Sequence, residues 1–386
     1  MVSHKLRPFG TTIFSEMTQL ALEHKAINLS QGFPDFDGPV EIQEAAMAAM
    51  RDGKNQYPRS QGILPLVEAI RDQREAVYGL SYDAKTEVSV FSGCTEGLMS
   101  SMLGLLDPGD EVILFEPVFD SYPACVAMAQ AVPRYATLKY PDFEIDFDHL
   151  ASLFNDKTKL LLLNTPHNPT GKVFSKEELE RIAQLCLRHD VVVLTDEVYE
   201  HLTFDGVPHI PMASLPEMRD RTLSLSSIGK TYSLTGWKIG WSTGPAHLVK
   251  AAQAAHQFVT FATASPLQYG AAVALRDFGG DYLDQLRKDY TARRDRLIEA
   301  LTAAGLRPND PKGAYYVLAD FSDVFDGDDV AFARHVTANI RVAAIPPSGF
   351  YPKSPECGRH LIRFAFCKQM DTLDQAAERL KKLRVS

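Results

Sequence analysis

The stretch Asp190-Val-Val-Val-Leu-Thr-Asp-Glu-Val-Tyr199 joins a short apolar run to a carboxylate and a phenol. A run this short and this apolar is typical of a strand that is buried on both faces of a sheet. Similar runs occur at residues 87–91, 111–115, 159–163, 222–225 and 239–241. Helical patterns lie between the runs, for example at 97–106 and 176–188. This alternation predicts an α/β fold with a mostly parallel sheet.

The chain beyond residue 280 has a different organisation. A long charged helical pattern covers 281–304, and a final amphipathic pattern starts near Thr372. Three apolar runs lie between these two patterns, at 314–318, 342–345 and 360–366. The arrangement predicts a smaller α+β domain that follows the main sheet.

Bulk properties argue against several classes of protein. The 386 residues carry a net charge of -9, which disfavours a nucleic-acid-binding surface. No apolar run approaches the length of a membrane span, and the basic N-terminal residues lack the apolar stretch of a signal peptide. The five cysteines are scattered without a CxxC pair, which predicts a reduced, cytoplasmic protein without structural zinc.

An acidic stretch at 320–329 partly matches a calcium-binding loop. If Gly327 takes the glycine position of such a loop, Val324 falls on a ligand position and Ala333 stands where a bidentate glutamate is needed. We therefore interpret the stretch as a solvated loop and helix cap, and we expect no metal site.

Asp196 and Tyr199 follow their apolar run directly, at the edge where open α/β sheets bind ligands. A structural interpretation makes Asp196 a helix N-cap and Tyr199 a core residue. In a functional interpretation, Asp196 pairs with a protonated pyridine nitrogen and Tyr199 donates to the phenolate oxygen of the same ring. Asn168 follows another run, in Asn164-Thr-Pro-His-Asn168, although turn chemistry alone also explains its Asn-Pro pair.

Lys230 lies in the segment Ser226-Ser-Ile-Gly-Lys-Thr-Tyr-Ser-Leu-Thr-Gly-Trp-Lys238, which follows the run 222–225. Most lysines are solvated surface charges. A lysine that is held partly out of water can instead lose its proton and attack a carbonyl carbon. Together with Asp196 and Tyr199, this lysine predicts the chemistry of pyridoxal phosphate.

Three further segments carry candidate binding residues. Ser92-Gly-Cys-Thr-Glu-Gly97 follows a run and opens a helix, so it is either a phosphate-binding turn or a plain strand–helix connection. Phe119 follows another run and is either a core residue or a platform for a cofactor ring. Arg363, inside Leu-Ile-Arg-Phe-Ala-Phe, either faces solvent or binds a buried anion such as a substrate carboxylate.

Taken together, these segments resemble the fold-type I, pyridoxal-phosphate-dependent aminotransferases of class I/II. The resemblance spans Thr11 to Leu383, and the methionine and kynurenine/glutamine aminotransferase branch is the nearest. The most specific matches are Ser30-Gln-Gly-Phe-Pro-Asp-Phe36 and the segment that holds Lys230. The resemblance implies a seven-stranded sheet in a large domain, residues 45–285. It also implies a small domain made of residues 1–44, with an N-terminal arm, and 286–386.

The resemblance also implies roles in cofactor binding. Lys230 would form the Schiff base and then carry the proton between the substrate and the cofactor. Asp196 would hold the pyridine nitrogen, Asn168 and Tyr199 the phenolate oxygen, and Phe119 the ring face. The phosphate would be held by the backbone of Cys94 and Thr95, by Ser227 and Lys238, and by Tyr57 of the partner subunit in a homodimer.

Cys94 departs from the small inert residue that is usual in this family. A helix start lowers a thiol pKa and a bound phosphate raises it, so we expect Cys94 to react only in the cofactor-free protein.

Substrate binding follows from the same resemblance. Arg363, with Asn168 and the backbone of Gly32, would hold the α-carboxylate. The side-chain pocket would be lined by Phe14, Phe33 and Phe261 of the partner subunit. Ala262 stands where kynurenine-type enzymes commonly have histidine, and no second arginine is evident for a dicarboxylate. We therefore expect methionine or another apolar, aromatic or glutamine-like amino acid as donor and a 2-oxo acid as acceptor.

Several alternatives remain open at this point. A cysteine-conjugate C–S β-lyase would use the same lysine, and an N-succinyl-diaminopimelate aminotransferase would keep the same reaction with another donor. A non-enzymatic, ligand-responsive regulator and an inactive scaffold are disfavoured, because no helix-turn-helix segment is added and every expected catalytic position is filled.

Overall fold

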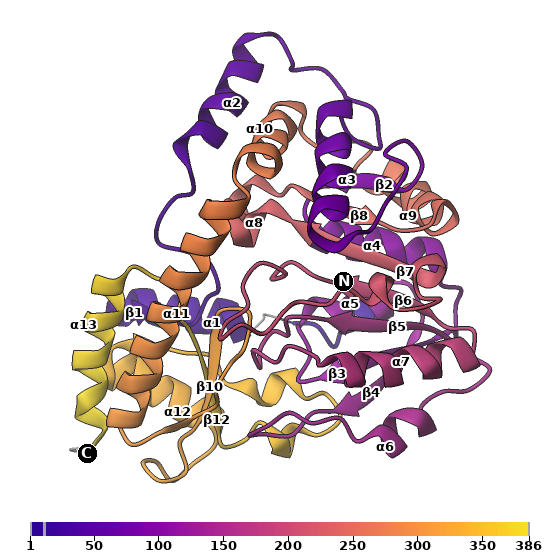
Figure 1. Ribbon diagram of the computed structural model, residues 1–386. Coiled ribbons are helices and arrows are strands. Elements are labelled where there is room, and N and C mark those ends of the chain that lie inside the picture. The colour runs from indigo at the N-terminus through magenta and orange to yellow at the C-terminus, as the bar shows by residue number, and fades with distance from the viewer. Residues whose placement is uncertain (1, 11–12, 385–386) are drawn as a thin grey trace.

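The computed structural model describes residues 2–10 and 13–384, apart from the side chains of residues 14 and 384. A seven-stranded sheet forms the larger part of the molecule, on the right in Figure 1. Its strands are, in spatial order, β2 (Val88–Phe91), β8 (Gly240–Thr243), β7 (Thr222–Ser227), β6 (Val192–Asp196), β5 (Thr158–Asn164), β3 (Glu111–Glu116) and β4 (Val132–Thr137). Only β8 runs antiparallel to its neighbours, so the predicted mostly parallel sheet is confirmed.

The central strand β5 shows why these short apolar runs become strands. Leu160 and Leu162 pack in one core cluster, and Leu161 and Leu163 pack in another on the opposite face. Side chains of a strand alternate between the two faces of its sheet, so a continuous leucine run suits a strand that is covered on both sides.

Helices cover both faces of the sheet. Helices α4 (Cys94–Leu105), α5 (Ser121–Met128) and α9 (Ala246–Val259) share one core cluster, and α6 (Phe147–Ser152) and α7 (Lys176–Arg188) share another. Helices α2 (Val40–Arg51), α3 (Leu64–Tyr78) and α10 (Ser265–Asp277) pack together beside β2 and β8. Helix α7 begins at a capping box, in which Ser175 and Glu178 each accept a hydrogen bond from the other's backbone amide.

The C-terminal and N-terminal segments build a second, smaller unit, on the left in Figure 1. Strand β10 (Tyr316–Asp320) lies between β12 (Leu361–Ala365) and β9 (Arg307–Pro308), and β1 (Ile27–Asn28) pairs with β11 (Val342–Ala343). The helices of this unit are α1 (Ile13–His24), α11 (Gly280–Ala303), α12 (Asp329–His335) and α13 (Met370–Leu380). The expected domain boundaries fall inside α2 and α11, and they stay a prediction.

One strand differs from the sequence-based expectation, and the acidic stretch agrees with it. Strand β4 was not expected, because Val132-Pro-Arg-Tyr-Ala-Thr137 is neither apolar nor regularly alternating. It lies at the edge of the sheet, where proline and exposed positions are tolerated. The acidic stretch does form a loop and cap, since Asp328 accepts a hydrogen bond from Ala331 N at the start of α12.

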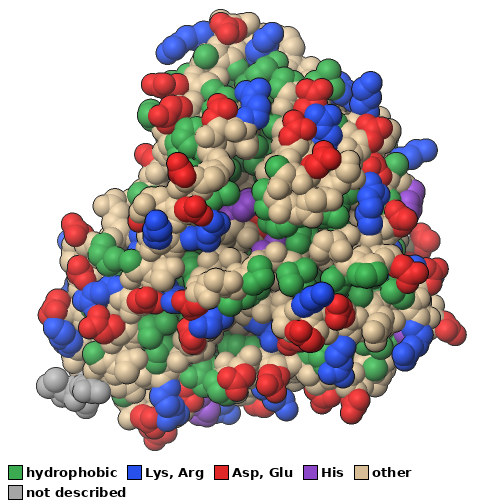
Figure 2. Space-filling model, viewed as in Figure 1, with side chains coloured by type: hydrophobic (Ala, Val, Ile, Leu, Met, Phe, Trp, Pro, Cys, Tyr) green, Lys and Arg blue, Asp and Glu red, His purple; other side chains and the backbone are tan. Residues whose placement is uncertain are grey.

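Acidic and basic side chains are interspersed on the face drawn in Figure 2, so this face shows no large patch of one charge sign. None of the helices in the described part of the chain is long and apolar enough to cross a membrane.

The packing of β5 leads to a stability prediction. We expect Leu161→Ala to lower the free energy of unfolding by about 3 kcal/mol, because it leaves a cavity in a closed core. Leu22→Ala makes the same deletion at a side chain that is 69% exposed, and it should cost less than about 0.5 kcal/mol. Urea unfolding of both variants measures the difference, and equal losses would contradict the buried position of Leu161.

Candidate active site

A cavity of about 260 Å³ lies at the carboxyl ends of β3, β5, β6 and β7, beside the start of α4. This is the edge at which open α/β sheets bind ligands. Nine residues that were expected at the site line the cavity: Cys94, Thr95, Phe119, Asn168, Asp196, Tyr199, Ser227, Lys230 and Lys238. The structure thus brings together residues that are up to 144 positions apart in the sequence.

Lys230 lies in α8 (Ile228–Thr231), a single turn that starts where β7 ends. Its Nζ donates a hydrogen bond to the carbonyl oxygen of Gly32 at 3.2 Å. Burial lowers the pKa of Lys230 to about 8, because the ammonium loses hydration. Lys238 and Arg363 lower this pKa further, whereas Asp196 opposes the shift. The amine is therefore available as a nucleophile and base near neutral pH.

Asp196 lines the cavity and is only 5% exposed. Its Oδ2 accepts a hydrogen bond from Tyr122 Oη at 2.8 Å, and its Oδ1 accepts one from Val198 N at 3.3 Å. Burial raises the pKa of Asp196, while these hydrogen bonds favour the carboxylate. Tyr122 was missed from the sequence, where its position in an apolar helix resembles that of a core residue.

Two neighbouring tyrosines at the start of β10, Tyr316 in the strand and Tyr315 directly before it, were also missed. Tyr316 lines the cavity, and its hydroxyl lies 3.4 Å from that of Tyr199. Its ring lies 4.3 Å from the guanidinium carbon of Arg363. Tyr315 donates a hydrogen bond to the carbonyl oxygen of Gly32. The pair Tyr-Tyr before an apolar run was the available signal, but such a pair is more often part of a core.

Arg363 sits in the middle of β12 and is 1% exposed. Its Nη1 donates to Asn168 Oδ1 at 3.2 Å, and its Nη2 donates to the carbonyl oxygen of Ser30 at 2.8 Å. Burial lowers the pKa of Arg363, and the tyrosine rings around it oppose that shift. The structure therefore places a desolvated guanidinium beside Asn168, which lines the cavity, so of the two interpretations of Arg363 the solvent-facing one is wrong and the anion site stays a prediction.

The segment around Gly32 passes close to Tyr316. A Cβ atom added to Gly32 would lie 1.9 Å from Tyr316 Oη, so this position accepts only glycine. Gly32 does not line the cavity itself, but its carbonyl oxygen contacts Lys230.

The part of the cavity beside the start of α4 suits a phosphate. Gly93, with a φ of +83°, precedes the first turn of α4, and the free amides of Cys94 and Thr95 open this helix. A Cβ on Gly93 would come within 3.1 Å of Lys238 Nζ, and one on Gly240 within 2.6 Å of Cys94 N. Glycines therefore keep this cradle open beside a lysine charge.

Of the expected site residues whose side chains the structure describes, Tyr57, Phe261 and Phe33 are not brought to this cavity within one chain, and Gly32 and Arg363 contact residues of the cavity without lining it. Tyr57 and Phe261 are 83% and 48% exposed and pack edge-to-face on one another at 5.2 Å. Phe33 is 42% exposed and does not line the cavity. The side chain of Phe14 lies outside the described part of the structure.

The surroundings of Cys94 argue against its expected reactivity, which stays a prediction. Burial raises the pKa of the Cys94 thiol well above its usual range, and the neighbouring Asp196 carboxylate raises it further. These effects oppose the helix start on which the expected reactivity rested.

Comparisons with known proteins agree with this geometry. The profile of the aminotransferase class I and II family matches residues 24–380. The solved structure of N-succinyldiaminopimelate aminotransferase from Mycobacterium tuberculosis is 43% identical, with a TM-score of 0.96, over 99% of this chain and 100% of that one. The methionine aminotransferase of Escherichia coli is 40% identical over 98% of this chain and 97% of its own length. The kynurenine–oxoglutarate transaminase of Dictyostelium discoideum is 38% identical over 99% and 96%.

The chain belongs to the aminotransferase class I and II family, and it is an aminotransferase with the type I fold of pyridoxal-phosphate-dependent enzymes. The described residues fit the cofactor of that class. An amine of low pKa, a carboxylate and a phenol line the cavity, and the cradle beside Gly93 and Gly240 can accept an anion.

The state of Lys230 can be tested in the cofactor-free protein. We expect labelling of its amine by an acylating reagent to reach half of its maximal rate at about pH 8, because only the neutral amine reacts. An ordinary surface lysine has a pKa of about 10.4 and provides the internal control. Peptide mass spectrometry across pH 6 to 11 measures both. Labelling of Lys230 in parallel with surface lysines would contradict its desolvation.

Cys94 provides a second test. The thiolate fraction of Cys94 should be smaller than that of a free thiol. At pH 7.5, iodoacetamide should therefore alkylate Cys94 more slowly than it alkylates the thiol of glutathione. The rate is read by mass spectrometry of the peptide that contains Cys94, with and without cofactor. A rate above that of glutathione in the cofactor-free protein would restore the original expectation.

Proposed function

We propose that this aminotransferase moves the amino group of an L-amino acid with an apolar or sulfur-containing side chain to a 2-oxo acid, in two half-reactions at one site. The observation that carries the proposal is the desolvated amine of Lys230, which lies in one cavity with Asp196, Tyr199 and Asn168, beside Arg363.

The cofactor in this proposal is pyridoxal phosphate, which the amine of Lys230 would hold. Asp196 pairs with the pyridine nitrogen, Asn168 and Tyr199 bind the phenolate oxygen, and Phe119 covers one face of the ring. The phosphate is bound by the amides of Cys94 and Thr95, by Ser227 and by Lys238. When bound, the cofactor supplies an electrophilic carbonyl and a protonated ring that accepts electron density from Cα of the amino acid.

Arg363 and Asn168 orient the substrate in this proposal. The fork of a guanidinium binds a carboxylate with two hydrogen bonds, and burial strengthens both. Fixing the α-carboxylate, with help from the backbone of Gly32, sets the direction of the Cα–H bond. The amine of Lys230 would take the proton from Cα as a general base and deliver it to C4′ of the cofactor as a general acid; its low pKa suits both transfers.

The choice of side chain rests on the charges around the cavity. Among the described residues that line it, the cations are Lys230 and Lys238, and both have other roles in this proposal. A second carboxylate in the substrate would therefore meet no free partner. We propose a side-chain pocket lined by Phe14 and Phe33, which favours methionine and other apolar, aromatic or glutamine-like donors.

The site is complete only in a homodimer, in this proposal. The exposed pair Tyr57 and Phe261 supports it, because large aromatic side chains on a surface are typical of interfaces. In the dimer, Tyr57 of the partner subunit contacts the phosphate and Phe261 of the partner subunit closes the side-chain pocket.

N-succinyl-diaminopimelate aminotransferase is the second candidate function. It is supported by the 43% identity to the Mycobacterium tuberculosis enzyme over nearly the full length of both chains. It shares every step that is proposed for Lys230, Asp196 and Arg363, and it differs only in the side chain that the pocket accepts.

The proposal is tested by single-turnover reactions of the cofactor-loaded protein with separate amino acids. We expect L-methionine, L-phenylalanine or L-glutamine to convert the cofactor at least about tenfold faster than L-aspartate, because burying an unpaired carboxylate is costly. Absorbance follows the cofactor, and an assay of the 2-oxo acid shows one equivalent of product. Lys230→Ala is the control and should give no conversion.

Other outcomes of the same experiment would reject this substrate class. Fastest conversion by N-succinyl-diaminopimelate would favour the second candidate. Release of pyruvate and a thiol from a cysteine conjugate, with the starting absorbance restored, would identify a C–S β-lyase. Normal transamination by Lys230→Ala would reject the role of this lysine.

A further inference from the structure

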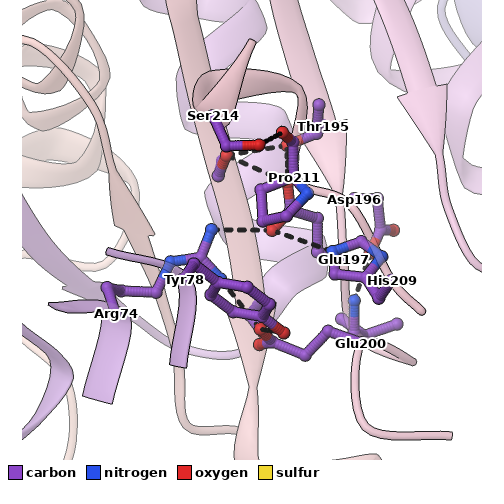
Figure 3. Close-up of polar contacts among 12 residues, drawn as sticks. Arg74, Tyr78, Thr195, Asp196, Glu197, Glu200, His209, Pro211 and Ser214 are labelled. Carbon is purple, nitrogen blue, oxygen red and sulfur yellow. Dashed lines mark hydrogen bonds and ion pairs between the residues drawn. The ribbon is translucent and has the colours of Figure 1, made fainter. Parts of the chain in front are cut away.

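The turn that follows β6 presents functional groups on two sides. Asp196 and Tyr199, three residues apart, line the active-site cavity. Glu197 and Glu200, also three residues apart, are 0% and 4% exposed, and both contact Arg74 of α3 instead of lining the cavity. Figure 3 shows the side chains of Asp196, Glu197 and Glu200 with Arg74. The orientation of the catalytic pair is therefore coupled to whatever holds the two glutamates.

One arginine holds both glutamates. Arg74 is 1% exposed, and its Nη2 donates to Glu197 Oε2 at 2.7 Å while its Nη1 donates to Glu200 Oε2 at 2.8 Å. The positive charge of Arg74 holds the pKa of both carboxyls below their usual range, although burial opposes this shift. A planar guanidinium with two bound carboxylates fixes distance and orientation together.

The remaining carboxylate oxygens connect the turn to β7. Glu197 Oε1 accepts from Thr195 Oγ1 at 2.8 Å and from Ser224 Oγ at 3.1 Å. Glu200 Oε1 accepts from Ser226 Oγ at 2.5 Å. Ser226 lies four residues before Lys230, at the end of the strand from which α8 starts. The cluster thus ties the segment of Asp196 and Tyr199 to the segment of Lys230.

The same residues do not offer a metal site. Glu197, Glu200 and His209 have potential ligand atoms within 4.8 Å of one another. Each carboxylate oxygen already accepts a hydrogen bond, with Tyr78 Oη as a second donor to Glu200 Oε2 at 2.8 Å. A divalent cation would have to displace the buried charge of Arg74, which lies between these carboxylates.

We infer that Arg74 is a positioning residue for the aminotransferase reaction. By clamping Glu197 and Glu200 it fixes the turn 196–200, and through Ser226 it sets the geometry of Asp196 and Tyr199 relative to Lys230. The inference rests on the proposed function. Displacements of about 1 Å in such a constellation cost about a hundredfold in rate, so a rigid clamp behind the site affects catalysis without touching the substrate.

The test uses Arg74→Lys, which keeps the charge and loses the fork. We expect kcat to fall at least about tenfold, while KM for the amino acid changes less than about twofold because Arg363 is untouched. The pH midpoint of the bound cofactor's absorbance should rise by at least about 0.5, because Tyr199 donates less well to the phenolate oxygen. Ser226→Ala removes only the link to β7, so it should shift both readouts in the same direction by a smaller amount.

Arg294→Lys is the matched control. Arg294 is another buried arginine, 5% exposed, and it holds both oxygens of Asp205 at 2.7 and 2.9 Å, with no contact to the turn 196–200. Arg294→Lys should lower the free energy of unfolding. Per folded, cofactor-loaded molecule, its kcat should stay within about twofold of the wild type, and its absorbance midpoint should stay within about 0.1 pH unit. The inference is overturned if Arg74→Lys and Ser226→Ala behave like this control.

Hydrogen exchange of the cofactor-free protein separates this inference from the proposed function. Glu197 N donates to Leu225 O, and Val198 N donates to Asp196 Oδ1. We expect both amides to exchange at least about tenfold faster in Arg74→Lys, with α7 unchanged. Unchanged exchange at residues 196–200 would reject the clamp even if the wild type is an active transaminase. Faster exchange in a protein that converts no amino acid would leave the clamp standing and reject the proposed function.

Discussion

The parallel register of the central strands is the constraint on which the site depends. Asn164 at the end of β5 pairs with Asp196 at the end of β6, and Asp196 pairs in turn with Leu225 near the end of β7. Buried backbone groups must find hydrogen-bond partners, and a shift by one residue would turn every side chain to the other face. The apolar faces of β5 therefore fix where Asp196 and Lys230 emerge.

Burial makes Lys230 and Asp196 reactive, and it also destabilises the charged form of each side chain. Desolvation lowers the pKa of Lys230 and raises that of Asp196, so each group would be unstable without specific partners. Tyr122 supplies a hydrogen bond to Asp196, and Asn168 with the carbonyl oxygen of Ser30 receives the guanidinium of Arg363. The donors and acceptors around the cavity are thus part of the chemistry, because they decide which protonation state survives out of water.

Family membership and substrate choice rest on different parts of the chain. Relatives named for N-succinyl-diaminopimelate, methionine and kynurenine are 43%, 40% and 38% identical, so overall similarity does not select among the three. The shared reaction depends on strand ends that the fold aligns. In the proposed function, the side-chain pocket depends instead on peripheral residues, such as Phe33 and Phe261 of the partner subunit, both of which are exposed in one chain. Such residues can vary while the sheet and the cavity stay the same.

The sequence by itself determined the strand–helix order and most of the candidate site. These features are local: an apolar run of the right length, followed by a polar residue, places that residue at the edge of a sheet. Nine of the expected residues meet in one cavity, and two of them, Ser227 and Lys238, were implied by the family resemblance and not by a local pattern. Only the tertiary structure decided the edge strand β4, the antiparallel direction of β8, and the roles of Tyr122 and Tyr316. It alone joined Arg74 to Glu197, which lies 123 residues away. The physical reason is that burial, desolvation and pairing of charges depend on neighbours brought together by folding, and no local pattern encodes those neighbours.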